Sequence, residues 1–103
     1  MPSLLTPSEL ETRLQALPSW GIELSPDRLV RRFTFPDFTV AFAFMTACAL
    51  QAEKMDHHPD WSNCWNAVDV RLSTHSAGGL TELDFELAYA MNQLADTLLG
   101  RLS

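Results

Sequence analysis

The sequence is short of positive charge, and this shortage excludes one class of partner. Seven Lys and Arg residues stand against 13 Asp and Glu, which gives a formal net charge of −6. The densest basic cluster is Arg28, Arg31 and Arg32. Binding to a phosphate backbone requires several clustered basic side chains, because each contact releases counterions. We therefore expect no direct nucleic-acid partner.

A long apolar run and a cysteine framework are also missing. The longest apolar stretch, residues 38–50, is too short to cross a bilayer and is interrupted by Thr39 and Thr46. No basic segment followed by an apolar one opens the chain, so we expect neither a secretory signal nor a membrane partner. Two cysteines make no disulfide framework, and reduced thiols in a cytoplasmic protein fit best. We expect Cys48, in an apolar helical run, to be buried.

The first part of the chain predicts a helix and a β-hairpin in one domain, residues 1–103. With 103 residues, 47% of them apolar, the chain is long enough for one hydrophobic core. Thr6, Pro7 and Glu9 are typical of a helix start, with a Thr cap and an acidic residue three positions later. Residues 20–24 and 29–35 alternate apolar and polar side chains around a turn sequence, which predicts the hairpin.

The rest of the chain predicts two longer helices and further strands. Asp37 caps a helix over 38–54, and residues 65–74 alternate as a strand, to which Asn63 and Cys64 either belong or pair. Thr81 caps the last helix. Adjacent strands joined by tight turns favour an α+β fold with two layers, an antiparallel sheet of about four strands and helices packed on one face.

Both long helices carry apolar side chains that we expect in the core. In the helix over 38–54 the expected face is Phe38, Ala41, Phe42, Met45, Ala49 and Ala52. In the last helix it is Leu83, Leu87, Met91, Leu94 and Leu98. The first of these helices is apolar beyond one stripe, which favours burial on two sides and hence a homo-oligomer.

The three histidines of the chain, His57, His58 and His75, all lie in one window of 19 residues. Histidine exchanges protons near neutral pH, so this clustering indicates a proton-transfer or ligand site. Three hypotheses compete. The first is general acid–base catalysis without a metal. The second is a zinc site that includes Cys64, disfavoured because adjacent residues rarely bind one ion. The third is a polar loop in a protein-interaction module.

Acidic and aromatic residues accompany the histidines. Glu53 lies one helical turn before His57, so we expect the carboxylate to orient that imidazole. Trp61 and Trp65 are candidates to wall a pocket for a flat substrate, although a core contact is the more frequent fate of a strand tryptophan. Asp84 stands three residues after Thr81, where it either caps the last helix or contacts His75 or a substrate.

The spacing of these residues resembles a known signature. It reads Glu53, three residues, His57-His58-Pro59, five residues, Trp65, nine residues, His75, eight residues, Asp84. This resembles the signature of the pterin-4a-carbinolamine dehydratases, a family that also acts in mammals as dimerisation cofactor of a homeodomain transcription factor. The resemblance extends from about Trp20 to the last helix.

The resemblance implies a reaction, site residues and partners. A dehydratase of this family eliminates water from a 4a-hydroxytetrahydropterin to give a quinonoid dihydropterin, which supports tetrahydrobiopterin recycling after an aromatic amino acid hydroxylase. It implies His57 and His75 as acid and base in an unassigned order, and His58 as mainly a positioning residue. Glu53, Trp61, Trp65 and Asp84 become candidate substrate-binding residues. The resemblance also implies a pterin as substrate, no cofactor and no metal, and a homodimer or homotetramer. The alternative is an interaction module, similar to a transcriptional coactivator, without catalysis.

Overall fold

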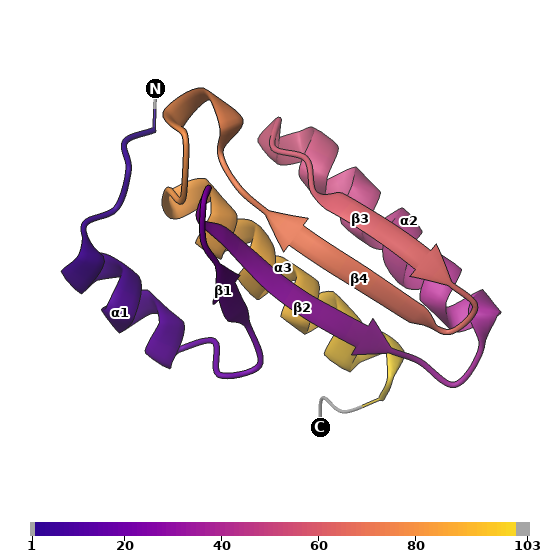
Figure 1. Cartoon of the computed structure of the whole chain (residues 1–103). Coiled ribbons are helices and arrows are strands. Elements are labelled where there is room, and N and C mark those ends of the chain that lie inside the picture. Colours follow the sequence, from indigo (N-terminus) through magenta and orange to yellow (C-terminus); the bar gives the residue numbers. More distant parts are fainter. Residues whose placement is uncertain (1, 101–103) are drawn as a thin grey trace.

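The computed structural model describes residues 2–100 and has an antiparallel sheet with three α-helices (Figure 1). In chain order the elements are α1 (Pro7–Gln15), β1 (Gly21–Glu23), β2 (Arg28–Thr34), α2 (Phe38–Met55), β3 (Asp60–Cys64), β4 (Ala67–Leu72), the 3₁₀-helix η1 (His75–Ala77) and α3 (Glu82–Leu98). The strand order in the sheet is β1-β2-β4-β3. The predicted α+β fold with a four-stranded sheet is confirmed, and Asn63 and Cys64 belong to a strand of their own that pairs with β4.

The two long helices lie on one side of the sheet, and the short one lies at its edge (Figure 1). Figure 1 shows α2 and α3 behind the strands, while α1 lies beside β1. The capping box predicted at Thr6 and Glu9 is present. A bidentate ion pair between Arg13 and Glu82 ties α1 to the start of α3, with Nε 2.9 Å from Oε2. No helix within residues 2–100 has both the length and the apolar character needed to cross a membrane.

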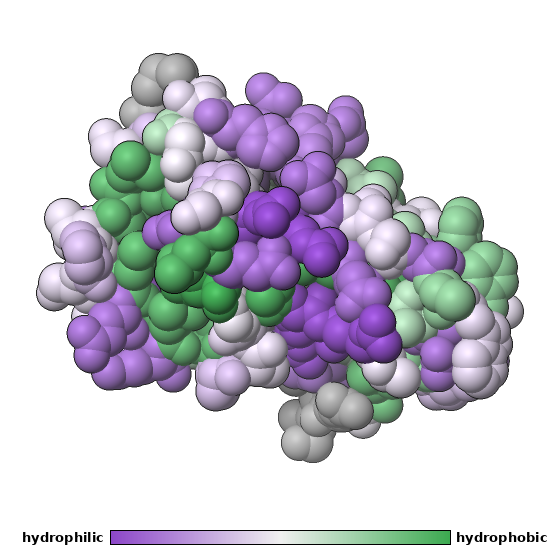
Figure 2. Space-filling view, in the orientation of Figure 1, coloured by the Kyte–Doolittle hydropathy of each residue, from purple (hydrophilic) through white to green (hydrophobic). Residues whose placement is uncertain are grey.

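Strand alternation separates an apolar face from a polar one. Phe33 pairs with Val68, and both are buried against the helices. Their neighbours Arg32 and Asp69 pair on the opposite face and form an ion pair there. Figure 2 shows a hydrophilic band across the middle of this uncovered face. A sheet with one solvated face is typical of antiparallel pairing.

The helix α2 begins at the predicted cap, Asp37, whose carboxylate accepts a hydrogen bond from the Val40 amide at 2.9 Å. Its predicted core face is wrong in part. The buried residues are Ala41, Phe44, Cys48 and Ala52. Phe38, Phe42 and Ala49 are exposed. The helix is apolar most of the way round, so its sequence alone does not decide which stripe faces the sheet; the docking of α3 beside it does.

The helix α3 begins at Thr81 with a capping box completed by Asp84, as predicted. The predicted core stripe is confirmed at Leu87 and Met91 and wrong elsewhere. The buried residues are Asp84, Phe85, Leu87, Ala88, Met91 and Ala95, while Leu83 and Leu94 are half-buried and Leu98 is exposed. Asp84 therefore occupies the first position of the buried stripe, where an apolar residue is the usual occupant.

Candidate functional site

A tight turn at the end of α2 places the two adjacent histidines. Asp56 adopts a left-handed conformation, with φ 51° and ψ 44°. The amide of His57 donates to Ala52 O at 3.1 Å and that of Asp56 to Glu53 O at 3.2 Å. This pair of hydrogen bonds is the Schellman motif, which ends a helix and reverses the chain direction. It buries the His57 side chain and leaves that of His58 exposed.

His57 makes a buried contact with Asp84. Its Nε2 lies 2.7 Å from Asp84 Oδ1, and the Asp84 side chain has no exposed surface. The other carboxylate oxygen of Asp84 accepts hydrogen bonds from the Thr81 amide at 2.9 Å and the Thr74 hydroxyl at 2.8 Å. The predicted cap role of Asp84 is confirmed, and its histidine partner is His57 rather than His75. A direct contact of Asp84 with substrate stays a prediction.

The predicted pair of Glu53 with His57 is wrong. Glu53 Oε1 lies 2.6 Å from His58 Nε2, and both side chains are exposed. The prediction applied helical spacing to His57, which lies two residues beyond the end of α2 at Met55. The left-handed turn then rotates His57 toward the core and brings His58 over the last helical turn.

His75 follows β4, at the first position of η1, as expected for a residue at a strand end. Its Nε2 lies 3.5 Å from Asp60 Oδ2, and its side chain is exposed. Asp60 is the first residue of β3 and pairs with Arg71 across the sheet. The contact links the chain segment after α2 to the segment after β4.

The three histidines line one cavity of about 290 Å³. Its lining residues are Asp56, His57, His58, Pro59, Asp60, Ser73, Thr74, His75 and Ser76. The predicted convergence of His57, His58 and His75 is thus confirmed. The volume is at the small end of ligand sites, which measure about 300–1,000 Å³. Sequence reasoning missed Asp60 and Thr74; the signal for Thr74 is its polar side chain at the end of an alternating strand, directly before His75.

The tryptophans lie outside this lining. Trp61 is half-buried and packs against the core. Trp65 is 65% exposed in the turn between β3 and β4, at the end of the hairpin opposite to the cavity, about 15 Å away along the strand. The expected core contact of Trp65 is therefore wrong, and substrate contacts of Trp61 and Trp65 stay predictions. Trp20 is in the core and donates from Nε1 to Asn92 at 2.8 Å.

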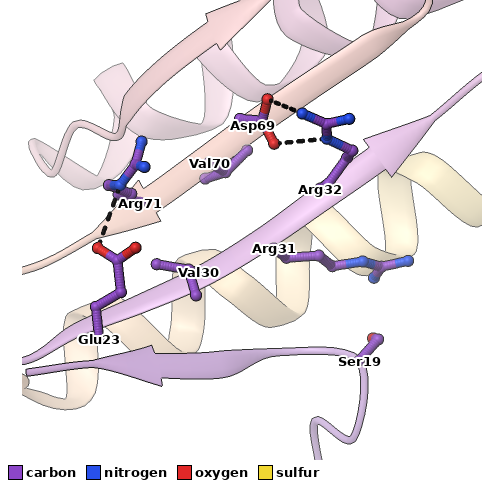
Figure 3. A pocket seen from close by; sticks show the side chains of 8 residues that line it. All are labelled: Ser19, Glu23, Val30, Arg31, Arg32, Asp69, Val70 and Arg71. Atoms are coloured by element: carbon purple, nitrogen blue, oxygen red, sulfur yellow. Dashed lines mark hydrogen bonds and ion pairs between the residues drawn. The ribbon is translucent and has the colours of Figure 1, made fainter.

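A second cavity, of about 380 Å³, opens on the uncovered face of the sheet (Figure 3). Figure 3 shows Arg32 paired with Asp69, and Arg71 directed at Glu23 across the cavity. The hydrogen bond from Arg32 holds the pKa of the Asp69 carboxyl below its usual value. These guanidinium groups are neutralised by the neighbouring carboxylates, so the histidine cavity is the stronger candidate for chemistry.

The two cysteines lie apart from the histidine cavity. Cys48 is buried, as predicted, and burial raises the pKa of its thiol to about 12. Cys64 is an exposed free thiol on β3 and does not line the histidine cavity. Within residues 2–100, no three His, Cys, Asp or Glu side chains gather in an arrangement that suits a metal ion.

Known proteins resemble this chain over most of its length. Residues 3–94 match the family model described as pterin 4 alpha carbinolamine dehydratase. A protein of Rhizorhabdus wittichii is 54% identical over 92 residues, which are 89% of this chain and 95% of the relative. A protein of a Chelativorans species is 52% identical over 87 residues, 84% of this chain and 89% of the relative. Both names give pterin-4-alpha-carbinolamine dehydratase as a provisional assignment.

Two solved structures share the fold. A crystal structure from Brucella melitensis, described as a transcriptional coactivator/pterin dehydratase, superposes with a TM-score of 0.85 at 49% identity and covers 88% of this chain and 97% of its own. A pterin dehydratase-like protein, described as a RuBisCO assembly factor in the alpha-carboxysome, superposes with a TM-score of 0.66 at 27% identity. That match covers 75% of this chain and 89% of the neighbour.

Proposed function

The chain belongs to the pterin 4 alpha carbinolamine dehydratase family, and from this premise we propose that it eliminates water from a 4a-hydroxytetrahydropterin. The observation that carries the proposal is the cavity lined by all three histidines, which come from two segments on either side of the β3–β4 hairpin. Loop residues that a rigid sheet holds together are the usual place for catalytic groups.

The reaction needs one proton delivered and one removed. The 4a-hydroxyl leaves as water after it accepts a proton, and the positive charge left on the ring is relieved by loss of the N5 proton. The product is a quinonoid dihydropterin, and no electron is gained or lost overall. General acid–base groups contribute about 10²–10⁴-fold each to such a step.

The histidines divide into two kinds by their surroundings. His57 is buried and held by Asp84, whereas His75 is exposed and near Asp60. Two imidazoles in such different environments suit two different proton-transfer roles. We assign the acid and base roles to this pair. His58, held by Glu53 at the cavity rim, is assigned to substrate positioning.

The proposal extends to the context of the reaction. Because the substrate carries a hydroxyl on a reduced pterin, it must be supplied by a hydroxylating enzyme that uses tetrahydropterin, such as an aromatic amino acid hydroxylase. The product requires a reductase for recycling. We propose that the protein carries out this dehydration in the cytoplasm, as a homodimer or homotetramer.

The decisive experiment follows the dehydration directly. A hydroxylase would generate 4a-hydroxytetrahydropterin, and its ultraviolet decay would be recorded with the native protein, with the His57→Ala and His75→Ala variants, and with buffer. A Thr97→Val variant serves as control, because Thr97 is exposed on α3 and lies outside the cavity. We expect acceleration by the native and control proteins and its loss in both histidine variants. Full activity in the histidine variants would contradict the assignment.

A second candidate function is a protein-interaction module, and the exposed apolar side chains of α2 favour it. Phe38 is 48% exposed, Phe42 56% and Leu50 70%. One structural neighbour is described as a transcriptional coactivator/pterin dehydratase and the other as a RuBisCO assembly factor. An interaction role should survive His57→Ala and His75→Ala and fail in a Phe42→Glu variant, measured as molar mass by light scattering and as partner binding.

A further inference from the structure

For an ionised Asp84, the hydrogen bonds around its carboxylate leave one arrangement of protons. Thr74 donates its single hydroxyl proton to Asp84 Oδ2 at 2.8 Å, because a carboxylate oxygen can only accept. The contact of 2.7 Å between the Thr74 and Thr81 hydroxyls must then carry the proton of Thr81. The Thr81 hydroxyl in turn accepts from the Leu83 amide at 3.3 Å. Asp84 Oδ2 also accepts from the Thr81 amide at 2.9 Å.

This arrangement fixes the proton on His57. With Oδ2 occupied by two donors, the other oxygen of Asp84 faces His57 Nε2 at 2.7 Å. A carboxylate oxygen accepts, so Nε2 carries a proton whether the imidazole is neutral or charged. The ring nitrogen that gains and loses a proton is therefore Nδ1.

The second ring nitrogen of His57 has access to the cavity. Within the described part of the chain, Nδ1 of His57 makes no hydrogen bond to protein. The side-chain nitrogen that is fully buried without a partner in that part of the chain is Arg28 Nε, and not His57 Nδ1. Nδ1 of the buried His57 is thus reached by solvent, and the ring lines the histidine cavity.

We propose that Thr74 and Thr81, acting through Asp84, are positioning residues that hold His57 as the Nε2–H tautomer and present Nδ1 to the substrate. The two neutral tautomers of an imidazole are selected by the hydrogen bond that the distal nitrogen makes. Here that bond goes to a buried carboxylate whose own orientation is set by two donors on its other oxygen. The catalytic consequence rests on the proposed dehydratase function, whereas the tautomer does not.

The Asp84→Asn variant tests the tautomer. If the amide oxygen keeps the donors from Thr74 and Thr81, the amide NH₂ replaces the oxygen that faces His57. Nε2 must then accept, and the tautomer reverses to Nδ1–H. Proton–nitrogen correlation spectra of the ¹⁵N-labelled imidazole, recorded with neutral rings, distinguish the two forms. We expect Nε2–H in the native protein and Nδ1–H in the variant. Nδ1–H in the native protein would overturn the proposal.

Thr74→Val tests the hydroxyl pair, and Thr74→Ser restores the hydroxyl. We expect Thr74→Val to give a mixture of tautomers and to lower kcat about 3–10-fold, which matches the loss of one hydrogen bond, with KM changed less than about twofold. Thr74→Ser should recover the native tautomer and most of kcat. Thr97→Val is the matched control, because it removes a hydroxyl that binds a backbone carbonyl of α3 outside the cavity. It should change neither the His57 tautomer nor kcat. A Thr74→Val protein with the native tautomer and kcat would exclude Thr74 from this role.

The readouts separate this proposal from the proposed function. For Asp84→Asn we expect kcat to fall by about 10²–10⁴-fold, because the neutral ring then carries its proton on Nδ1, so that the nitrogen facing the cavity cannot accept a proton. If the native protein shows Nε2–H but no dehydration over buffer, the dehydratase function fails and the positioning network stands. If dehydration is fast and Asp84→Asn keeps both Nε2–H and full kcat, the function stands and this inference fails.

Discussion

Replacement of Asp56 tests whether the turn after α2 holds His57 in place. Asp56 has φ 51° and ψ 44°, a left-handed conformation that costs about 1–2 kcal/mol for a residue with a Cβ. Asp tolerates it better than most, and a β-branched residue tolerates it least. Asp56→Val therefore raises the strain, while Asp56→Gly removes it.

Two responses to the strain compete in Asp56→Val, and their magnitudes decide between them. If the turn opens, the chain loses two backbone hydrogen bonds, each worth about 0.5–1.5 kcal/mol. It also loses the bond from His57 to the buried Asp84 carboxylate, worth about 1.5–3 kcal/mol. Opening thus costs about 2.5–6 kcal/mol, more than the strain. We expect the turn to persist and the free energy of unfolding to fall by at most about 1–2 kcal/mol, because Asp56 already carries part of this cost.

The glycine variant is the matched control. Asp56→Gly relieves the backbone strain, but the added entropy of the unfolded chain opposes this gain by about 0.4–1 kcal/mol. We therefore expect the free energy of unfolding to change by no more than about 0.5–1 kcal/mol. Urea denaturation followed by tryptophan fluorescence, at one fixed protein concentration, measures both variants. The His57 tautomer should stay native in each. Equal destabilisation by Gly and Val, or none by Val, would refute the argument from backbone conformation.

Three further predictions concern the thiols, the core and acid stability. Because burial raises the pKa of Cys48 to about 12, a thiol reagent at mildly alkaline pH should modify Cys64 alone until the protein unfolds; rapid reaction at both thiols would contradict this. Phe44→Ala should cost about 3–5 kcal/mol in urea denaturation, whereas Phe42→Ala, at a side chain 56% exposed, should cost less than about 1 kcal/mol. The pKa of Asp69 is lowered by an arginine, so its stabilising effect is present above the unfolded-state pKa and is lost as the pH falls through the folded-state pKa. Asp69→Asn should therefore lose less stability in acid than the native chain, and parallel acid denaturation curves would exclude the effect.

The sequence alone determined the elements and where most of them begin. The caps at Thr6, Asp37 and Thr81 act within three residues of themselves, so short-range signals suffice to find them. Strand alternation likewise depends on neighbours in the sequence, which is why the hairpin over residues 20–35 and the strand before His75 could be predicted.

Only the tertiary structure decided which side chains meet. His57 and Asp84 are 27 residues apart, and their contact exists because the turn after α2 points His57 at the start of α3. The same turn places His58, rather than His57, in hydrogen-bond contact with Glu53. Trp65 stands at a fixed place in the signature, yet one β-strand carries it to the far end of the hairpin. Spacing records which residues a site contains, whereas the direction of each side chain depends on a backbone reversal and on the docking of two helices, which no local pattern encodes.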